Sequence, residues 1–174
     1  HAAQVDDDKL SAIKGHQKLV IAEFGVEFYT QLHATGHGGS GSLASTTAVL
    51  SGVSDDTFRA ITQQAYSDTV ASLQQAGFEV VDAAALRANP KYQELAQKYG
   101  NPSPWVLSDE KLTDGKPSIS KTFAPDGMPA FFSSSLGRGN FSQRFDAQNQ
   151  GRGDREGDIA KALGVTLLHV HYLA

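Results

Sequence analysis

The chain has 174 residues, with 15 Lys and Arg against 19 Asp and Glu and a formal net charge of −4. This mildly acidic balance argues against a general nucleic-acid binder, which needs a basic surface. The absence of cysteine excludes thiol catalysis, disulfide scaffolds and cysteine-ligated zinc, and the absence of an apolar run of about 18 residues excludes an ordinary membrane-spanning helix.

The first 17 residues predict a polar lead-in, followed by a single domain over residues 18–174. The small residues in His1-Ala2-Ala3 are typical of the end of a secretory signal peptide, although a tag remnant is the alternative. We therefore expect a periplasmic or otherwise exported protein, with the cytoplasm as the alternative location.

Residues 18–29, KLVIAEFGVEFY, have the β-branched and aromatic content of a buried strand. The following residues 31–53 are rich in Gly, Ser and Thr, which predicts a long loop. Long loops in small domains are often functional, so we expect this segment to belong to the working surface.

The clearest helix comes next. Ser54 is a suitable N-cap, and Gly77 lies where a glycine commonly ends a helix. Between them Phe58, Ile61 and Leu73 recur at helical spacing, which predicts that they face the sheet.

The middle of the chain is less regular. A short strand is predicted over residues 78–82, and residues 83–99 predict helix interrupted by Pro90. Residues 100–126 contain several prolines and predict irregular structure with short strands at most. A third strand is predicted over residues 128–133.

A second long polar loop is predicted over residues 134–154, and a helix then runs to Leu163 before Gly164. The last predicted strand covers residues 165–172. Because the chain stops almost directly after it, we expect the sequence to be truncated at the C-terminus. The element order β-α-β-α-(β)-α-β predicts an α/β fold class, a single two- or three-layer domain with an at least partly parallel sheet.

One glycine-rich run offers a ligand site. The spacing of Gly36, Gly38 and Gly41 satisfies the GxGxxG pattern of dinucleotide-binding loops, and Asp82 ends a predicted strand where an acidic side chain would contact the ribose. However, these glycines fall in the middle of a predicted loop and not at a strand-to-helix turn, which favours an ordinary loop.

Complete catalytic motifs are missing from the sequence. The run His37-Gly38-Gly39 is similar to the oxyanion loop of some esterases, but no GxSxG nucleophile turn accompanies it. No Lys-Ser or Lys-Thr follows a glycine at the spacing of a phosphate-binding P-loop. We therefore predict no catalytic residue and no cofactor.

Two histidines are weak candidates for a metal site. His169 and His171 alternate along the last predicted strand, so both side chains point to one face. A zinc site needs at least one further ligand, and the sequence does not identify one. We expect structural histidines and no bound metal.

The opening strand (LVIAEF), the helix ending in LQQAGFEVVD and the later helix–strand step IAKALGVTLLHVHYL together resemble an envelope α/β domain. It is found in the curli-secretion-channel (CsgG-like) proteins and in the N-terminal domain of TolB-like proteins. The resemblance covers roughly residues 18–95 and 155–174. It implies a cell-envelope protein that binds other proteins or forms oligomers, and it implies no catalytic residues.

These observations predict a non-enzymatic, exported cell-envelope domain that works by protein–protein interaction or self-association, without binding nucleic acid. The alternative is a nucleotide- or small-molecule-binding α/β domain, or an enzyme, that uses the loop Gly36–Gly41 together with Asp82.

Overall fold

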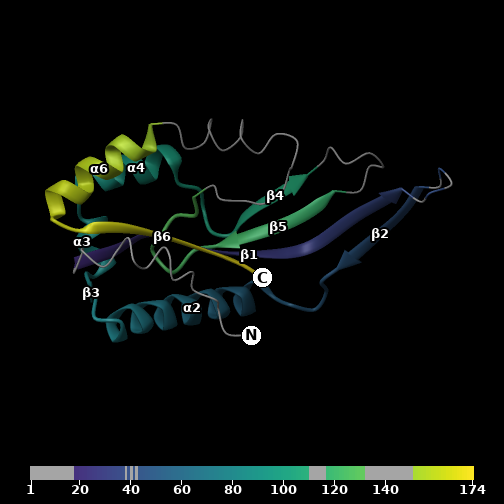
Figure 1. The fold of residues 1–174 in the computed structure, drawn as a ribbon, viewed down its shortest axis with the longest axis horizontal. Coiled ribbons are helices and arrows are strands. Elements are labelled where there is room, and N and C mark those ends of the chain that lie inside the picture. Colours follow the sequence, from purple (N-terminus) through teal and green to yellow (C-terminus); the bar gives the residue numbers. More distant parts are fainter. Residues whose placement is uncertain (1–17, 38, 40, 42, 110–116, 132–150) are drawn as a thin grey trace.

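In a computed structural model of the protein, one long central strand pairs with strands from all parts of the chain (Figure 1). The structure describes residues 18–37, 39, 41, 43–109, 117–131 and 151–174. The predicted lead-in over residues 1–17 and most of the predicted loop over 134–154 lie outside this part of the chain.

The described residues form six strands and four helices in the order β-β-α-β-α-α-β-β-α-β. In chain order these elements are β1 (Lys18–His37), β2 (Leu43–Val49), α2 (Asp55–Gln75), β3 (Glu79–Val80), α3 (Ala83–Arg87), α4 (Pro90–Tyr99), β4 (Trp105–Asp109), β5 (Ser118–Phe123), α6 (Arg152–Leu163) and β6 (Thr166–Leu173).

Strand β1 organises the sheet. One of its edges pairs antiparallel with β5, which in turn pairs antiparallel with β4. Its other edge pairs in parallel with β6 along residues 19–27 and antiparallel with β2 along residues 31–37. The two residues of β3 pair in parallel with the start of β1.

The predicted fold class, an α/β domain of order β-α-β-α-(β)-α-β, is therefore wrong. Three of the five strand pairings among the described residues are antiparallel, and β1 is followed by a hairpin partner and not by a crossover helix. The sequence reading missed this because it assigned residues 31–53 to a loop. A parallel partner needs a long crossover connection, whereas the short connection between His37 and Leu43 joins two antiparallel strands as a hairpin.

The hairpin corrects the predicted loop. Residues 31–37 belong to β1 and residues 43–49 to β2, with Gln31 opposite Val49 and Gly36 opposite Ala44. Thr46, Thr47 and Val49 are β-branched, which suits a strand even in a glycine-rich stretch. Figure 1 shows this hairpin extending beyond the helices; we call its paired residues, 31–37 and 43–49, the arm.

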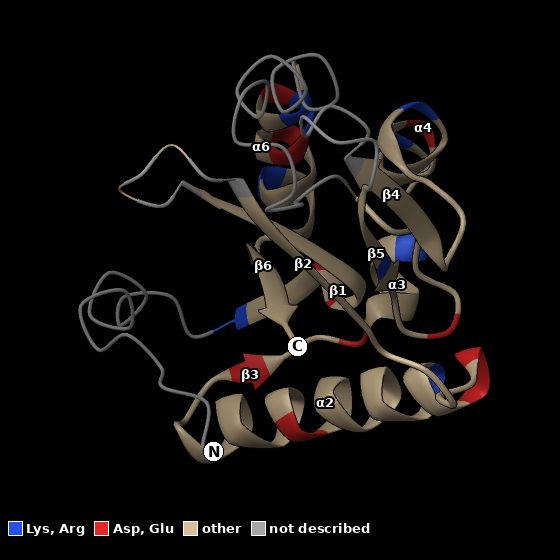
Figure 2. Ribbon diagram, turned by 90° about the vertical axis from the view of Figure 1, so that its right-hand side faces the viewer, with Lys and Arg blue, Asp and Glu red and all other residues tan. Residues whose placement is uncertain are grey.

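Each face of the sheet packs against helices (Figures 1 and 2). On one face, α2 covers an aromatic cluster in which the Phe28 and Phe58 rings lie 4.3 Å apart. On the other face, α3, α4 and α6 cover Val20 and Ala22, together with Leu86, Leu95 and Ile159 from the helices themselves. All these side chains are buried.

The helices confirm most of the local signals. Ser54 caps α2 by accepting a hydrogen bond from the Thr57 amide at 3.2 Å, and Gly77 follows its end with a φ of 93°. Pro90 does not kink a helix but begins a new one, α4, after the N-cap Asn89.

The prediction that Ile61 of α2 faces the sheet is wrong. Ile61 is 46% exposed, whereas Phe58 and Thr62, one helical turn apart, are buried. The stripe that faces the sheet runs through positions 58, 62, 65, 66 and 73, and Ile61 lies at its margin. The third strand predicted over residues 128–133 is reduced, in its described part, to a single bridge between Ala130 and Asn101.

Candidate functional site

A shift in strand register turns two carboxylates of β1 toward the face of the sheet that α3, α4 and α6 cover. In the β1–β6 ladder Ile21 pairs with Leu168 and Glu23 with His169, so that Ala22 is an extra residue. Before the bulge, Val20 and Ala22 face α6; after it, Phe24 and its alternate neighbours face α2. A bulge of this kind re-aims the following side chains, here those of Glu23 and Glu27.

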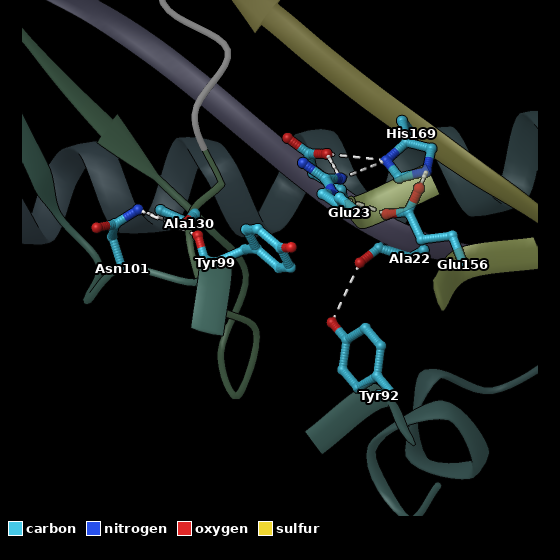
Figure 3. Close-up of polar contacts among 9 residues, drawn as sticks. Ala22, Glu23, Tyr92, Tyr99, Asn101, Ala130, Glu156 and His169 are labelled. Atoms are coloured by element: carbon cyan, nitrogen blue, oxygen red, sulfur yellow. Dashed lines mark hydrogen bonds and ion pairs between the residues drawn. The ribbon is translucent and has the colours of Figure 1, made fainter. Parts of the chain in front are cut away.

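Glu23 lies in a cluster of four charged side chains (Figure 3). Its Oε2 atom accepts a hydrogen bond from Nη2 of Arg152 and lies 2.8 Å from Nδ1 of His169. Glu156 completes the cluster, with Oε1 2.7 Å from Nε of Arg152 and Oε2 3.4 Å from Nε2 of His169. We call these residues the charge cluster.

The helix α6 contributes Arg152 and Glu156 to the cluster, because its first turn faces the sheet. Arg152 is the first residue of α6, and Glu156 is four residues later on the same side of the helix. Gly151 precedes the helix with a φ of 78°, a conformation that favours glycine. The Arg152 guanidinium also lies 4.3 Å from the centre of the Phe131 ring, so its face is covered as well as its edges.

Burial and pairing act against each other on these groups. Burial disfavours the Glu23 carboxylate, but the hydrogen bond from His169 and the charge of Arg152 outweigh it and lower the pKa of Glu23. Burial likewise opposes a charged His169, but its hydrogen bonds to Glu156 and Glu23 raise the pKa of this ring to about 9. A pKa of about 9 favours the imidazolium at neutral pH, in which Nδ1 faces Glu23 and Nε2 faces Glu156; Nη2 of Arg152 also lies 2.8 Å from Nδ1.

The charge cluster is arranged to hold structure. Among the described residues the cluster combines two cations with two anions, and each carboxylate contacts both cations. General acid–base catalysis favours a group that titrates near neutral pH, whereas the carboxylates of Glu23 and Glu156 titrate low and His169 titrates high. The arrangement fastens α6 to β1 and β6.

Next to the cluster, Tyr92 connects α4 to the bulge in β1. Its hydroxyl donates to the carbonyl oxygen of Ala22, the bulged residue, at 3.1 Å (Figure 3). Burial raises the pKa of Tyr92 to about 12, so the hydroxyl keeps its proton throughout the ordinary pH range.

A second polar group follows four residues further along β1. Glu27 is fully buried, and its Oε1 atom accepts a 2.6 Å hydrogen bond from the Ser120 hydroxyl. His171 places Nε2 3.4 Å from Oε2 of Glu27, while its buried Nδ1 has no hydrogen-bond partner in the part of the chain that the structure describes. Gly25 makes room for this ring, because a Cβ at this position would lie 3.2 Å from Nδ1 of His171.

The two histidines singled out by the sequence do face the same side of β6, each against a glutamate of β1. The described residues contain no group of three or more His, Asp or Glu side chains placed to hold a metal ion. His169 and His171 thus have carboxylate partners that account for their positions.

The glycines of the glycine-loop hypothesis lie far from Asp82. Gly36 is paired within β1, Gly41 lies in the turn before β2, and Gly38 is outside the described residues. Asp82 caps α3, with Oδ1 2.8 Å from the Ala84 amide nitrogen. It follows β3, which pairs with the opposite end of β1, so most of the length of β1 separates Asp82 from Gly36.

The arm differs from both polar groups because it is largely exposed. Leu32 and Val49 of the arm have exposed fractions of 48% and 62%, and Leu50, the next residue along the chain, has 48%. Where the arm joins the body, His33 is buried and its Nδ1 lies 2.7 Å from the Thr47 hydroxyl. Between Glu27 and Asp55 the sequence contains no Asp, Glu, Lys or Arg.

Sequence reasoning missed Glu23, Arg152 and Glu156. The available signal was the pair of carboxylates at positions 23 and 27 within an otherwise apolar strand, because buried acids require partners.

None of the helices that the structure describes is long and apolar enough to cross a membrane. In comparisons with known proteins the chain significantly matches no family model, no curated protein and no solved structure.

Proposed function

We propose that this chain is a non-enzymatic domain for protein–protein interaction and assembly, and that the arm is its contact surface. The observation that carries the proposal is the outer edge of β2. Among the described strands β2 pairs only with β1, so its other edge presents unpaired backbone groups next to exposed side chains.

The chemistry of this edge supports strand addition. Proteins that keep an edge strand single usually place Lys, Pro or a bulge on it, and β2 contains none of these. Its sequence LASTTAV combines β-branched residues with small ones and carries no charge. Such an edge binds another strand through main-chain hydrogen bonds.

The buried polar groups support a non-enzymatic role in a different way. The charge cluster is engaged in ion pairs that tie α6 to the sheet, and Glu27 is held by Ser120. These contacts account for the positions of the acids and histidines without a substrate. The cell-envelope location implied by the resemblance to the CsgG-like and TolB-like domains stays a prediction.

Sedimentation velocity over a range of protein concentrations tests the proposal. We expect the mass of the wild type to rise above the 18.5 kDa of one chain. Ser45→Lys, which places a charge on the exposed β2, should hold the protein at the mass of one chain. Ala60→Lys adds the same charge to the exposed surface of α2 and should behave as the wild type.

A wild type that keeps the mass of one chain at every concentration would contradict assembly through the arm. So would a Ser45→Lys protein that associates as strongly as the wild type. Circular dichroism spectra of both variants verify that the charge has not unfolded them.

A further inference from the structure

We propose that the strand added to β2 is β2 of a second copy of this chain, antiparallel to the first and centred on Thr46. This inference rests on the proposed function, because it names the partner and the register of the contact. It follows from the direction of the backbone groups, from the sequence of β2 and from its charge.

The backbone direction is set by the pairing with β1. The Leu50 amide donates to the Thr30 carbonyl at 2.9 Å, and Gln31 is opposite Val49. Backbone groups alternate along a strand, so Ala44, Thr46 and Ala48 also point toward β1. The free groups on the outer edge are those of the odd-numbered residues: Leu43, Ser45, Thr47 and Val49.

A two-fold contact must join odd-numbered residues to odd-numbered residues. A register centred on Thr46 meets this condition, because it places Ser45 opposite Thr47 and Leu43 opposite Val49 of the other copy. Each of these becomes a hydrogen-bonded pair, while Thr46 faces its own counterpart in a non-hydrogen-bonded pair. A shift of one residue in the pairing would bring outward-pointing groups against inward-pointing ones.

The sequence of β2 reads almost the same in both directions around Thr46. In LASTTAV, the central register pairs Ala44 with Ala48, Ser45 with Thr47, and Leu43 with Val49. Cross-strand Ser–Thr and aliphatic pairs stabilise antiparallel strands. The two nearest permitted registers are centred on Thr47 and on Ser45. The first would set Ser45 against Val49 and the second Leu43 against Thr47, in each case a polar residue against an apolar one.

The charge distribution allows a second copy to bind at the arm. The chain has a formal net charge of −4, so two copies repel each other over most contact surfaces. Residues 28–54 carry none of this formal charge, and Figure 2 shows β2 without a red or blue residue. The arm also extends beyond the helices, so an antiparallel contact leaves the two bodies at opposite ends (Figure 1).

The contact also completes the arm as a sheet. A two-stranded hairpin is marginally stable alone, and three or more strands are needed for independent stability. Self-pairing of β2 yields the four-stranded order β1–β2–β2–β1 and removes the exposed edge of β2 in both copies at once.

Cysteine cross-linking tests the register, since the chain has no cysteine of its own. In a non-hydrogen-bonded pair the Cα atoms are about 4.5 Å apart, within the range of a disulfide. Thr46→Cys, oxidised with diamide as the two-electron acceptor, should therefore form a covalent dimer. Ala60→Cys on the exposed surface of α2 is the control for random collision.

Two further variants fix the register. Ala44→Cys and Ala48→Cys should each fail to cross-link alone, because equivalent residues are then four positions apart along the strands, roughly 14 Å. An equal mixture should form the mixed dimer, identified by mass spectrometry of the disulfide-linked peptides.

The outcomes separate the two proposals. If Thr46→Cys cross-links no faster than Ala60→Cys, while Ser45→Lys still abolishes association, the register proposed here is wrong and the arm remains the contact surface. If neither the wild type nor any arm variant associates, the proposed function fails, and this inference fails with it.

Discussion

Arg152, the first residue of α6, forms an ion pair with Glu23 in the first half of β1, and both side chains are buried. The pair joins the last helix of the described chain to its first strand. Because a buried charge without its partner pays a large desolvation penalty, the pair is far more sensitive to the loss of one member than an exposed pair is.

We expect Arg152→Met to lower the free energy of unfolding by about 3–5 kcal/mol, because Glu23 then remains buried without its guanidinium partner. The matched control is Lys91→Met, which breaks an exposed pair with Asp158 and should cost about 1 kcal/mol or less. Urea unfolding followed by circular dichroism measures both. Equal losses in the two variants would show that the pair is not buried in solution.

Stability should fall between about pH 6.5 and pH 9 because of His169. Its pKa is 6.5 as an ordinary group and about 9 in the folded chain, so the folded state binds the extra proton across this window. The contribution is complete below the unfolded pKa and is lost as the pH rises through the folded pKa. Urea midpoints at a series of pH values should show a difference between wild type and His169→Gln that is largest near pH 6. A difference that does not shrink by pH 9.5 would contradict the assignment.

The acids of the charge cluster act in the opposite direction. The pKa of Glu23 and that of Glu156 are both lowered by His169 and Arg152 against the opposing effect of burial. Their contribution is present above the ordinary pKa of 4.5 and is lost as the pH falls through the lowered values. Glu156→Gln should therefore weaken the loss of stability that the wild type shows below about pH 4.5. The same urea series, extended to pH 3, measures this loss. If the stability of Glu156→Gln fell as steeply below pH 4.5 as that of the wild type, the expectation would be wrong.

Gly25→Ala should destabilise the fold by about 1–3 kcal/mol, because the new methyl group meets the His171 ring at 3.2 Å and Thr122 at 3.3 Å. Gly36→Ala is the matched control, since its added Cβ has open space around it. Removing the ring by His171→Ala should reduce the cost of Gly25→Ala, which a double-mutant cycle of unfolding free energies measures. Additive effects would mean that the two residues do not compete for space.

Alanine substitutions in α2 test its buried face. Phe58 is buried in the aromatic cluster, so Phe58→Ala should cost about 3–5 kcal/mol. Ile61 is 46% exposed, so Ile61→Ala should cost about 1 kcal/mol or less. Thermal and urea unfolding of the two variants compare these values. A larger loss for Ile61 would restore the face predicted from the sequence.

The helix signals could be read from the sequence because they are local. Ser54, Gly77 and the Asn89-Pro90 step each act within one or two helical turns, and the helices begin and end where these residues predict. The strand after Gly164 was predicted for the same reason. The exposure of Ile61 is not a local property, since it depends on how α2 is rotated against the sheet.

The hairpin could not be read in the same way. Residues 31–53 have the composition of a loop, and Thr46 or Thr47 becomes part of a strand only because residues 31–37 lie alongside. The charge cluster depends on even more distant contacts. Glu23 and His169 were visible as residue types, but only the bulge at Ala22 and the ladder with β6 bring them together.

The pairing of β1 with β6 also has a consequence for the order of events in folding. Leu19 and Thr166 are neighbours in the sheet, although they lie near opposite ends of the described chain. Contacts of such long sequence separation form late and slowly, because the entropy of closing the loop is lost before they stabilise the chain. During synthesis on the ribosome, residues 19–27 of β1 therefore lack this partner until residues 166–173 have been made, although residues 31–37 of the same edge can already pair with β2. The apolar residues beside that edge are the ones most exposed to aggregation before β6 arrives.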